Sequence, residues 1–577
     1  VLDKVTNAAG EETLFESDGR GNRIKATDPS GRVTRWTYNS FDQVTSVSVG
    51  ETAAPLSAST AGVVTSTVAY NADGLPTVMV DAVGTAAGAT TTFTYDTTHP
   101  EDLVAAVDGR GKRWEYVYDS DTGDLLEAVD PEGGSSTMAY NSIGWVTSVV
   151  APKGNETGAT PADWMTRFEH DDWGRVVAEV DPLANRVETT FDANGNVIST
   201  ETGLSATVTA GDVTTYGYDA VDRLTTVDPP GPGARTYSYD ADGRRTGFVN
   251  EVNEPGDGWV YAYDDLGRLE SQTDPADATT AYGYDEASRL VSVTQPRGNC
   301  ASTPAVDCIT YSYDPAGRPT GVDYSDPATP DVTGIVYDAV GRRTAASRAG
   351  DTEAWAWDAR SRLVSHTDVN GRATTFGWDD TGNLVSIGYP GQSTPLTRAF
   401  DDAGQMVSVT DWASRTTTFD YDGNGNWEST VFPTSSQNTD VYAYDRADRM
   451  VGVTWKRGTA TLGSLAYAPR DAKGLVTSVT GTGSAASAGQ VWDYDTRDRL
   501  VDTGSEEFGF DAATNLVDAD GVLQVFDPAQ RLCWTSDTAT GGDCGTPPAD
   551  ATTYGYDERG NRTSMTYPSG TTASYGF

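Results

Sequence analysis

A short unit recurs along the whole chain and restricts the folds that this chain can adopt. Residues 261–268 read YAYDDLGR, and the next copy begins with YGYD at 282–285. Successive copies start roughly 20 to 25 residues apart, and about 23 copies are recognisable. Repeats of this length predict an array of like supersecondary units that stack on their neighbours.

Each copy predicts a β-hairpin. The opening aromatic–small–aromatic stretch has the period of a strand, so both rings lie on one face. The Asp-x-x-Gly that follows is typical of a tight turn, because aspartate bonds nearby backbone groups and glycine accepts positive φ. A second strand follows, as at 289–294, and its end is marked by Asp-Pro, as at 274–275. We expect the following rings of the repeats to form the core: Tyr218, Tyr239, Tyr263, Tyr284, Tyr313, Tyr337, Trp357, Trp378, Tyr421 and Tyr444.

The hairpins cannot be stable one by one, because an isolated two-stranded hairpin is marginal in water. Stacked neighbours supply the missing partner strands. We therefore expect an all-β fold in which tandem hairpins form a long spiralling antiparallel sheet, shaped as a strip, tube or shell. We expect one continuous array over residues 1–577, with degenerate copies near 15–22, 165–175 and 465–475. The chain begins and ends within the pattern, so we expect it to be a segment of a longer protein.

The two kinds of turn differ in length. The Asp-x-x-Gly turn is nearly constant, whereas insertions gather at the turn near Asp-Pro. These insertions cover 50–64, 151–164, 201–213, 295–308 and 480–490. Equivalent turns of a hairpin array line up on one edge, so one rim should carry the insertions. Insertions are tolerated where backbone is exposed, and we predict that this rim holds the binding surface if the chain has one.

Charge and cysteine content limit the environment and the partners. The net charge is −44, which argues against nucleic-acid or anionic-membrane binding, since both need a basic surface. The four cysteines form two local pairs, Cys300 with Cys308 and Cys533 with Cys544. We predict two disulfides and an oxidising compartment. Free thiols and a zinc site are the alternatives, although no histidine neighbours a cysteine.

The sequence contains no pattern that indicates a catalytic or metal site. His99, His170 and His366 lie at unrelated positions of the repeat, and the many carboxylates are explained by turn bonding. Segments 119–124 and 422–426 look somewhat like calcium loops, but they lack the EF-hand spacing and coincide with ordinary turns. We expect no catalytic residue, no cofactor and no bound metal. Four tryptophans outside the repeat phase are candidates for surface contact, for example with sugars: Trp145, Trp164, Trp412 and Trp534.

The pattern Tyr-x-Tyr-Asp-x-x-Gly-Arg-Leu, followed by a Thr-Asp-Pro-x-Gly turn, closely resembles the RHS/YD-repeat family from about residue 12 to 577. That family includes bacterial RHS polymorphic toxins, the C components of insecticidal toxin complexes, and teneurins. The resemblance implies a spiralled β-shell, which encloses a C-terminal toxic domain in the toxins and is part of an adhesion molecule in teneurins. The DPxG motifs at 28–31, 130–133 and 314–317 fit repeat turns and lie far apart, so the family's self-cleaving pair is not carried over.

The resemblance gives the leading hypothesis for function. We expect a structural shell segment of a secreted or surface-displayed toxin-like protein, which encloses and presents a cargo domain. Its expected partner is a C-terminal cargo or toxin domain of the same polypeptide, with no nucleic acid and no membrane span in this segment. The alternative is an extracellular adhesion module that binds a carbohydrate or a cell-surface protein through the loops of one rim. We expect no enzymatic activity of its own.

Overall fold

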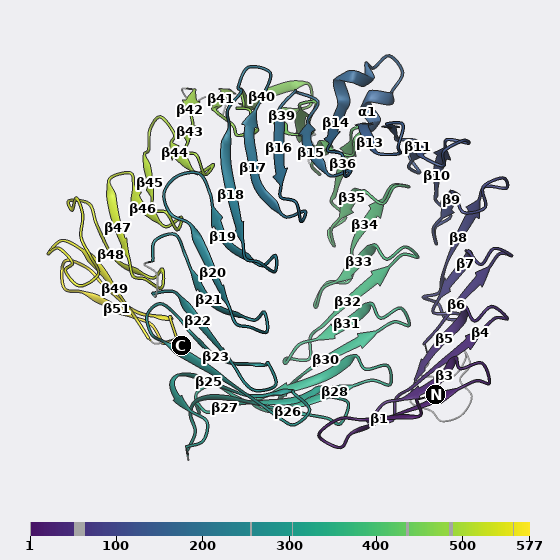
Figure 1. The fold of residues 1–577 in the computed structure, drawn as a ribbon, viewed down its shortest axis with the longest axis horizontal. Coiled ribbons are helices and arrows are strands. Elements are labelled where there is room, and N and C mark those ends of the chain that lie inside the picture. Colours follow the sequence, from purple (N-terminus) through teal and green to yellow (C-terminus); the bar gives the residue numbers. More distant parts are fainter. Residues whose placement is uncertain are drawn as a thin grey trace. The chain divides into compact units, whose positions relative to one another are not determined.

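The computed structural model describes residues 2–50, 64–253, 257–302, 304–433, 438–483, 489–557 and 559–576. Nearly all regular structure in these residues is β-strand, with one short helix, α1 (Pro152–Asn155), and one 3-10 turn, η1 (Pro161–Trp164). None of the described helices has the length and apolar character needed to span a membrane. The predicted all-β class is confirmed (Figure 1).

The strands follow one another as hairpins along the chain. Strands β1–β13 are Lys4–Thr6, Glu12–Ser17, Arg23–Thr27, Val33–Tyr38, Val44–Gly50, Val64–Tyr70, Pro76–Asp81, Ala89–Tyr95, Leu103–Val107, Arg113–Tyr118, Leu125–Val129, Ser135–Tyr140 and Val146–Val150. Strands β14–β25 are Met165–His170, Val176–Val180, Arg186–Phe191, Val197–Leu204, Asp212–Tyr218, Leu224–Asp228, Arg235–Tyr239, Arg245–Val249, Trp259–Tyr263, Leu269–Thr273, Thr279–Tyr284 and Leu290–Asn299. Strands β26–β38 are Val306–Tyr313, Pro319–Tyr324, Val332–Tyr337, Arg343–Arg348, Asp351–Trp357, Leu363–Thr367, Ala373–Trp378, Leu384–Gly388, Leu396–Phe400, Met406–Thr410, Thr416–Tyr421, Trp427–Val431 and Asn438–Tyr444. Strands β39–β51 are Met450–Arg457, Ala460–Tyr467, Ser478–Gly483, Gln490–Val491, Asp493–Tyr494, Leu500–Asp502, Phe508–Phe510, Leu516–Ala519, Val522–Phe526, Leu532–Ser536, Thr552–Tyr556, Arg562–Thr566 and Thr572–Ser574.

Pairing is antiparallel between strands that are neighbours in the sequence. In the hairpin β22–β23, Tyr261 faces Gln272 and Ala262 faces Ser271. The register then shifts by one residue, so that Tyr263 faces Leu269. Strands β1–β42 belong to one sheet of 42 strands, β43 and β44 form a pair, and β45–β51 form a sheet of seven strands. The predicted long antiparallel sheet of tandem hairpins is therefore confirmed.

The two kinds of turn share one geometry, which the sequence pattern did not indicate. We call the turn after the aromatic strand the hairpin turn and the turn that leads into the next aromatic strand the connecting turn. In the hairpin turn at Asp264, Oδ1 accepts the backbone N–H of Leu266 at 3.0 Å and of Arg268 at 2.9 Å. In the connecting turn at Asp274, Oδ1 accepts the N–H of the residues two and four positions later at 2.8 and 2.9 Å. The degenerate copy at His170 uses the same turn, through Asp171.

Few side chains are fully buried. Along β22 the residues alternate between half-buried and exposed, with all three aromatic rings on the half-buried face. The same alternation occurs in β10 and, from Thr236 on, in β20. The repeat therefore gains its stability from contacts between successive hairpins more than from a deep core.

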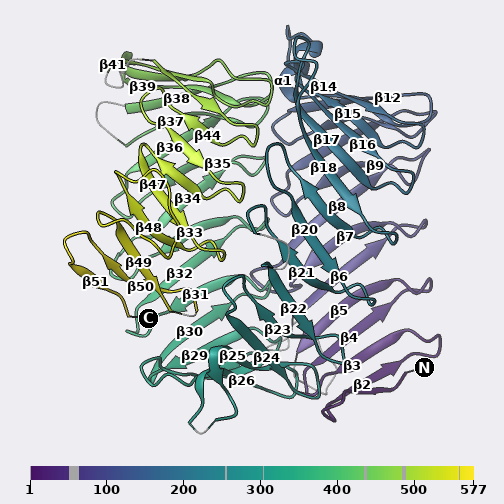
Figure 2. The same cartoon turned by 60° about the vertical axis from the view of Figure 1, so that its left-hand side comes forward.

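The chain divides into two compact units, which we describe separately. Unit 1 comprises residues 1–164, 284–291 and 309–440. Unit 2 comprises residues 165–283, 292–308 and 441–577. Each unit thus contains two stretches of hairpins that are distant in sequence, which we call its first and second tier. In unit 1, the hairpins of the second tier from β30 to β37 run side by side (Figure 2). The prediction of a single continuous array remains a prediction.

Candidate functional site in the turns and seams

In many repeats one arginine ties its own turn to the next hairpin. Arg223 Nε lies 2.6 Å from Asp219 Oδ2 in the same turn. Its Nη1 donates to the carbonyl oxygen of Asp240 in the next hairpin at 2.8 Å. The guanidinium carbon also lies 4.8 Å from the ring centre of Tyr239. We call this Asp–Arg–aromatic arrangement the clasp; it combines a charge-assisted pair with a cation–π contact.

The clasp recurs along both units. The ion pair, the bond to the next turn and the ring contact are all present for Arg175, Arg289, Arg362 and Arg499. The turn also affects ionisation. The backbone N–H of Arg268 and then its side chain hold the pKa of Asp264 below its ordinary value. The turn carboxylates are therefore held in the ionised form by structural bonds.

Where a Tyr or Trp ends the first strand, it supplies a second link between repeats. Tyr239 Oη donates to the carbonyl oxygen of Leu224 at 2.8 Å, and Trp378 Nε1 donates to that of Leu363 at 2.8 Å. The same bond is made by Tyr218, Tyr263, Tyr313, Tyr337, Trp357 and Tyr421. Tyr284 and Tyr444 end β24 and β38 in the same way. All ten predicted core rings are half-buried, so the interior they form is shallower than a conventional core.

In unit 1 the connecting turns of the first tier meet the hairpin turns of the second tier. Arg32 Nη1 donates to the carbonyl oxygen of Val340 at 3.0 Å, across 308 residues of sequence. Arg110 Nη1 donates to the carbonyl oxygen of Asp401 at 2.8 Å. Arg289 Nη1 lies 2.8 Å from Glu11 Oε1. We call this line of contacts the seam of unit 1; it joins the edges of two tiers through turns alone.

Unit 2 has a seam of the same kind. Arg497 Nε donates to the carbonyl oxygen of Pro230 at 2.7 Å, and its Nη2 donates to that of Pro232 at 2.6 Å. Lys473, whose side chain is 13% exposed, pairs with Asp212 and with Asp498. Burial alone would lower the pKa of Lys473, but the hydrogen bonds to these two carboxylates raise it. The ammonium is therefore kept charged at the seam.

Three of the insertions on this rim make contacts with the opposing tier, and the binding rim remains a prediction. In unit 1, Lys153 of the 151–164 insertion lies 2.9 Å from Asp422 Oδ2. In unit 2, Asp212 of the 201–213 insertion binds Lys473, and Asp307 of the 295–308 insertion binds Arg559. These three insertions reach the opposing tier and complete the seams. Most of the other two insertions, residues 51–63 and 484–488, lies outside the described residues.

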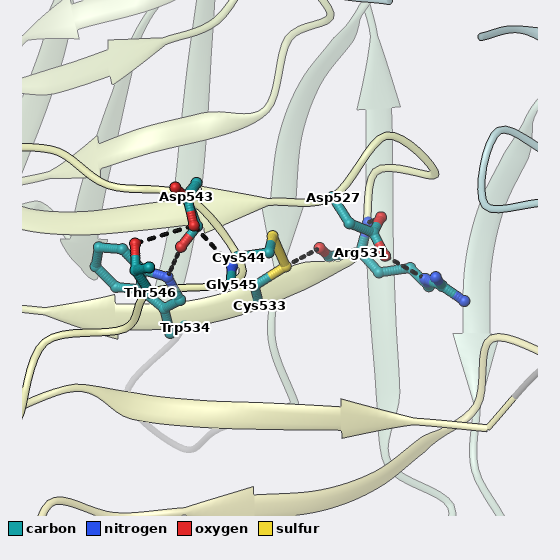
Figure 3. The surroundings of a disulfide bond; sticks show 8 residues. All are labelled: Asp527, Arg531, Cys533, Trp534, Asp543, Cys544, Gly545 and Thr546. Carbon is teal, nitrogen blue, oxygen red and sulfur yellow. Dashed lines mark hydrogen bonds and ion pairs between the residues drawn. A yellow bond between two sulfur atoms is a disulfide. The ribbon is translucent and has the colours of Figure 1, made fainter.

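Both cysteine pairs are disulfides in the structure, Cys300–Cys308 and Cys533–Cys544. The second bond holds a long loop against Trp534 (Figure 3). Trp534 is 0% exposed, and its Nε1 donates to the carbonyl oxygen of Asp543 at 2.8 Å. The prediction that Trp534 makes surface contacts is therefore wrong, because this loop folds over the indole.

The other three candidate tryptophans differ in exposure. Trp412 is 40% exposed and meets the ring of Tyr389 edge-on at 5.5 Å. Trp164 is half-buried beneath Lys153, whose Nζ lies 5.1 Å from the ring centre. Trp145 is half-buried in its turn, at the position where other repeats carry the clasp arginine. Of the four, only Trp412 retains a large accessible face, and its role in surface contact remains a prediction.

The structure places the three histidines on separate elements. His99 lies in the turn after β8, His170 ends β14, and His366 lies within β31. The described residues contain no group of three or more potential ligands that could hold a metal. In both segments that look like calcium loops the aspartate serves its own turn: Asp119 Oδ1 accepts the N–H of Asp121 at 2.8 Å, and Asp422 Oδ1 accepts that of Asn424 at 3.0 Å.

A row of exposed apolar side chains was missed in the sequence. It occupies the third position of five first-tier hairpin turns. In unit 1 these are Phe41 at 74% and Ile143 at 64% exposure. In unit 2 they are Trp173 at 77%, Val221 at 66% and Leu266 at 71%. In the second tiers, the same position carries seam residues, including Val340, Asn424, Lys473, Arg497 and Arg559.

Comparison with known proteins identifies the repeat. The family model described as RHS Repeat matches residues 18–54, 263–299, 337–373, 357–394 and 546–572. A curated relative, double-stranded DNA deaminase toxin A of Burkholderia cenocepacia (strain H111), is 24% identical over 430 residues, which cover 69% of this chain and 28% of the relative.

Solved structures share the fold. The crystal structure of TcdB2-TccC3-Cdc42 is similar with a TM-score of 0.63 at 13% identity, over 98% of this chain and 38% of that one. TcdB2-TccC3-TEV gives 0.59 at 15% identity, over 98% and 34%. A Tc holotoxin pore of Photorhabdus luminescens gives 0.52 at 14% identity, over 96% and 29%. At these identities the likeness shows the fold alone.

Clasped hairpins joined by turn-to-turn seams define a tandem β-hairpin repeat protein. The chain carries RHS repeats at the five matched stretches and shares the fold of the solved structures. The chain matches 28% of the curated relative and from 29% to 38% of the three solved chains. The activity of those larger proteins is thus not assigned to this segment by the match.

Proposed function

We propose that this chain is a structural segment of a toxin-associated RHS-repeat shell, which encloses and presents a cargo domain of the same polypeptide. The observation that carries this proposal is the pair of seams. Within each unit they bond the edges of two tiers that lie far apart in sequence. A wall that must retain a cargo needs such edge-to-edge closure, since open sheet edges and gaps between tiers would admit solvent and partners.

In this proposal the charged residues of the repeat, the turn aspartates and clasp arginines, have structural roles. Turn aspartates bind backbone N–H groups and clasp arginines, which explains their charge and their position without a catalytic role. We therefore propose no enzymatic activity for the segment. The two disulfides support a secreted or cell-surface location, because such bonds persist in oxidising compartments.

The comparisons support the toxin setting and not the adhesion alternative. The curated relative is named as a toxin, and one structural neighbour is a Tc holotoxin pore. A cargo within the same polypeptide is the partner that this setting suggests. Three of the rim loops that an adhesion module would use each contribute a side chain to the seams.

Protease protection tests this function. In the natural polypeptide that contains this chain, the expected result is that any domain beyond residue 577 resists a protease that digests the same domain expressed alone. The seam variant Lys473→Ala/Arg497→Ala should speed its digestion. The matched control Arg372→Ala/Arg415→Ala removes two exposed clasp-type arginines away from the seams and should not. Equal digestion of the cargo inside the polypeptide and alone would refute enclosure.

A further inference from the structure

A cavity in unit 1 lies between the two tiers, beside the seam. Its volume is about 590 Å³, within the ~300–1,000 Å³ typical of ligand pockets. Aromatic rings of Trp114, Phe419 and Tyr421 contribute to its lining, together with the carboxylates of Asp130 and Asp401. Among the described residues, no lysine or arginine lines this cavity. Its wall is therefore acidic and aromatic.

Three cations beside the cavity are engaged in ion pairs or hydrogen bonds. Lys112 Nζ lies 2.5 Å from Asp402 Oδ1, and Lys153 Nζ lies 2.9 Å from Asp422 Oδ2. Arg110 donates to the carbonyl oxygens of Asp401 and Asp402, not to the Asp401 carboxylate. Of the carboxylates that line the cavity, Asp422 is therefore paired, whereas Asp130 and Asp401 have no ion-pair partner among the described residues.

In other turns of this chain, an arginine side chain lies between the turn carboxylate and the next aromatic ring. In the clasp of the same tier, Arg362 Nε lies 2.7 Å from Asp358 Oδ2, and the guanidinium lies 5.7 Å from the ring centre of Trp378. At the Asp401 turn the arginine is replaced by Gln405. Its Nε2 still donates to the next turn, at Gly425 O (3.2 Å), but its side chain makes no bond to Asp401 Oδ2. The carboxylate and the Tyr421 ring remain, without the guanidinium that would join them.

In neighbouring turns that lack the arginine, an asparagine side chain donates to the second oxygen of the turn carboxylate. Asn383 Nδ2 donates to Asp379 Oδ2 at 2.9 Å, and Asn426 Nδ2 donates to Asp422 Oδ2 at 3.2 Å. Asp401 Oδ1 accepts the backbone N–H of Gln405 at 2.7 Å, but Oδ2 has no side-chain donor among the described residues. Across the cavity, Asp130 Oδ1 accepts two backbone N–H groups, and the position four residues on is Gly134.

We propose that this cavity binds the guanidinium of an arginine side chain presented by a peptide segment. The ligand would complete the clasp that Gln405 leaves open, with its charge on Asp401, a flat face on Tyr421 or Trp114, and Asp130 as a second acceptor. Guanidinium is favoured over ammonium because it is planar, donates in a fork to carboxylates and stacks on aromatic faces. The site does not depend on the proposed shell function.

The test uses the full chain and fluorescein-labelled Gly-Gly-Arg-Gly-Gly, with otherwise identical citrulline and lysine peptides. Fluorescence anisotropy should show saturable binding of the arginine peptide, weaker for citrulline by at least about tenfold because the charge-assisted bonds are lost. A photo-crosslinking version of the arginine peptide should label the segments around Trp114 and Tyr421. Absence of saturable binding, or a lysine or citrulline peptide that binds equally well, would overturn the proposal.

The sharpest variant is Gln405→Arg, which restores the repeat's own clasp and fills the site from within. It should abolish binding while the chain stays as resistant to urea as the parent or more so. Asp130→Asn should weaken binding about tenfold by removing the second acceptor charge. The matched control is Gln43→Arg, at the equivalent glutamine of another turn, where Gln43 Nε2 donates to Gly74 O. Unchanged binding to Gln405→Arg would refute the site even if the peptide binds elsewhere.

Discussion

Replacing Arg497 by alanine should open the seam of unit 2 locally. This side chain donates to three carbonyl oxygens of the opposing tier: Pro230 at 2.7 Å, Pro232 at 2.6 Å and Gly233 at 3.1 Å. Hydrogen bonds from charged donors contribute about 1.5–3 kcal/mol each when buried. Arg497 is half-buried, the three bonds share one guanidinium, and water can replace it, so a total loss of about 2–3 kcal/mol is expected.

Hydrogen exchange is the suitable assay, because a repeat array unfolds in parts and a single global free energy is not well defined. Protection should fall by roughly 30- to 150-fold at backbone amides near 230–235 and 511–515, as the loss above requires at about 1.4 kcal/mol per factor of ten. Protection in unit 1 should not change. Arg372→Ala is the control: its arginine is 63% exposed in a single ion pair, which is worth ~0–1 kcal/mol. Equal effects of the two variants would refute the idea that the seam is a bonded joint.

Three further predictions concern the loops and the turns. Cys533→Ala/Cys544→Ala should cost the C-terminal sheet about 2–4 kcal/mol and shift Trp534 fluorescence to the red as its covering loop loosens; an unchanged emission maximum would contradict this account. Gly542→Ala should cost about 1–3 kcal/mol in urea denaturation, because a Cβ there would lie 2.5 Å from the Trp534 ring, whereas Gly541→Ala meets no atom within 4 Å and should be neutral. The folded-state pKa of Asp264 is below its ordinary value of about 3.9, so its contribution to stability is complete above that value and is lost as the pH falls through the lowered pKa. Amide protection around 264–268 should therefore fall below pH ~4 in the parent and stay flat in Asp264→Asn, and a parent that is equally flat would show that the carboxylate is not bound in the turn.

The fold was predictable because each hairpin is encoded locally. The spacing of Tyr261, Tyr263, Asp264 and Gly267 specifies strand, turn and the facing strand within about 15 residues. The seams were not predictable, since they join positions such as Arg32 and Val340 that no local pattern relates. Their donors also differ from turn to turn, so no second repeat signals them.

The burial of Trp534 also could not be predicted from the repeat pattern. Its position outside the repeat phase suggested exposure, but burial comes from Gly542 and Asp543, which belong to a loop and not to the repeat. The adjacent cysteines carried the missing signal, because a disulfide at that point must fold the loop back over the second strand. The Gln405 cavity could have been suspected from the absent arginine, but its Trp114 wall comes from the other tier, which no local pattern indicates.

The third residue of the hairpin turn has little part in the turn itself. Val221 and Leu266 each give it only a backbone N–H, to an Oδ1 atom 3.0 Å away, and Trp173 adds to that bond a ring contact with Arg175 of the same turn. Any residue except proline can make that bond, so this position is free to vary without unfolding its hairpin. In the second tiers the same position supplies seam side chains, such as Lys473 and Arg497. In such an array, a substitution at the third turn position can therefore change the contacts between tiers without affecting the fold of its hairpin. Different residues of one repeat thus determine hairpin folding and contact between tiers.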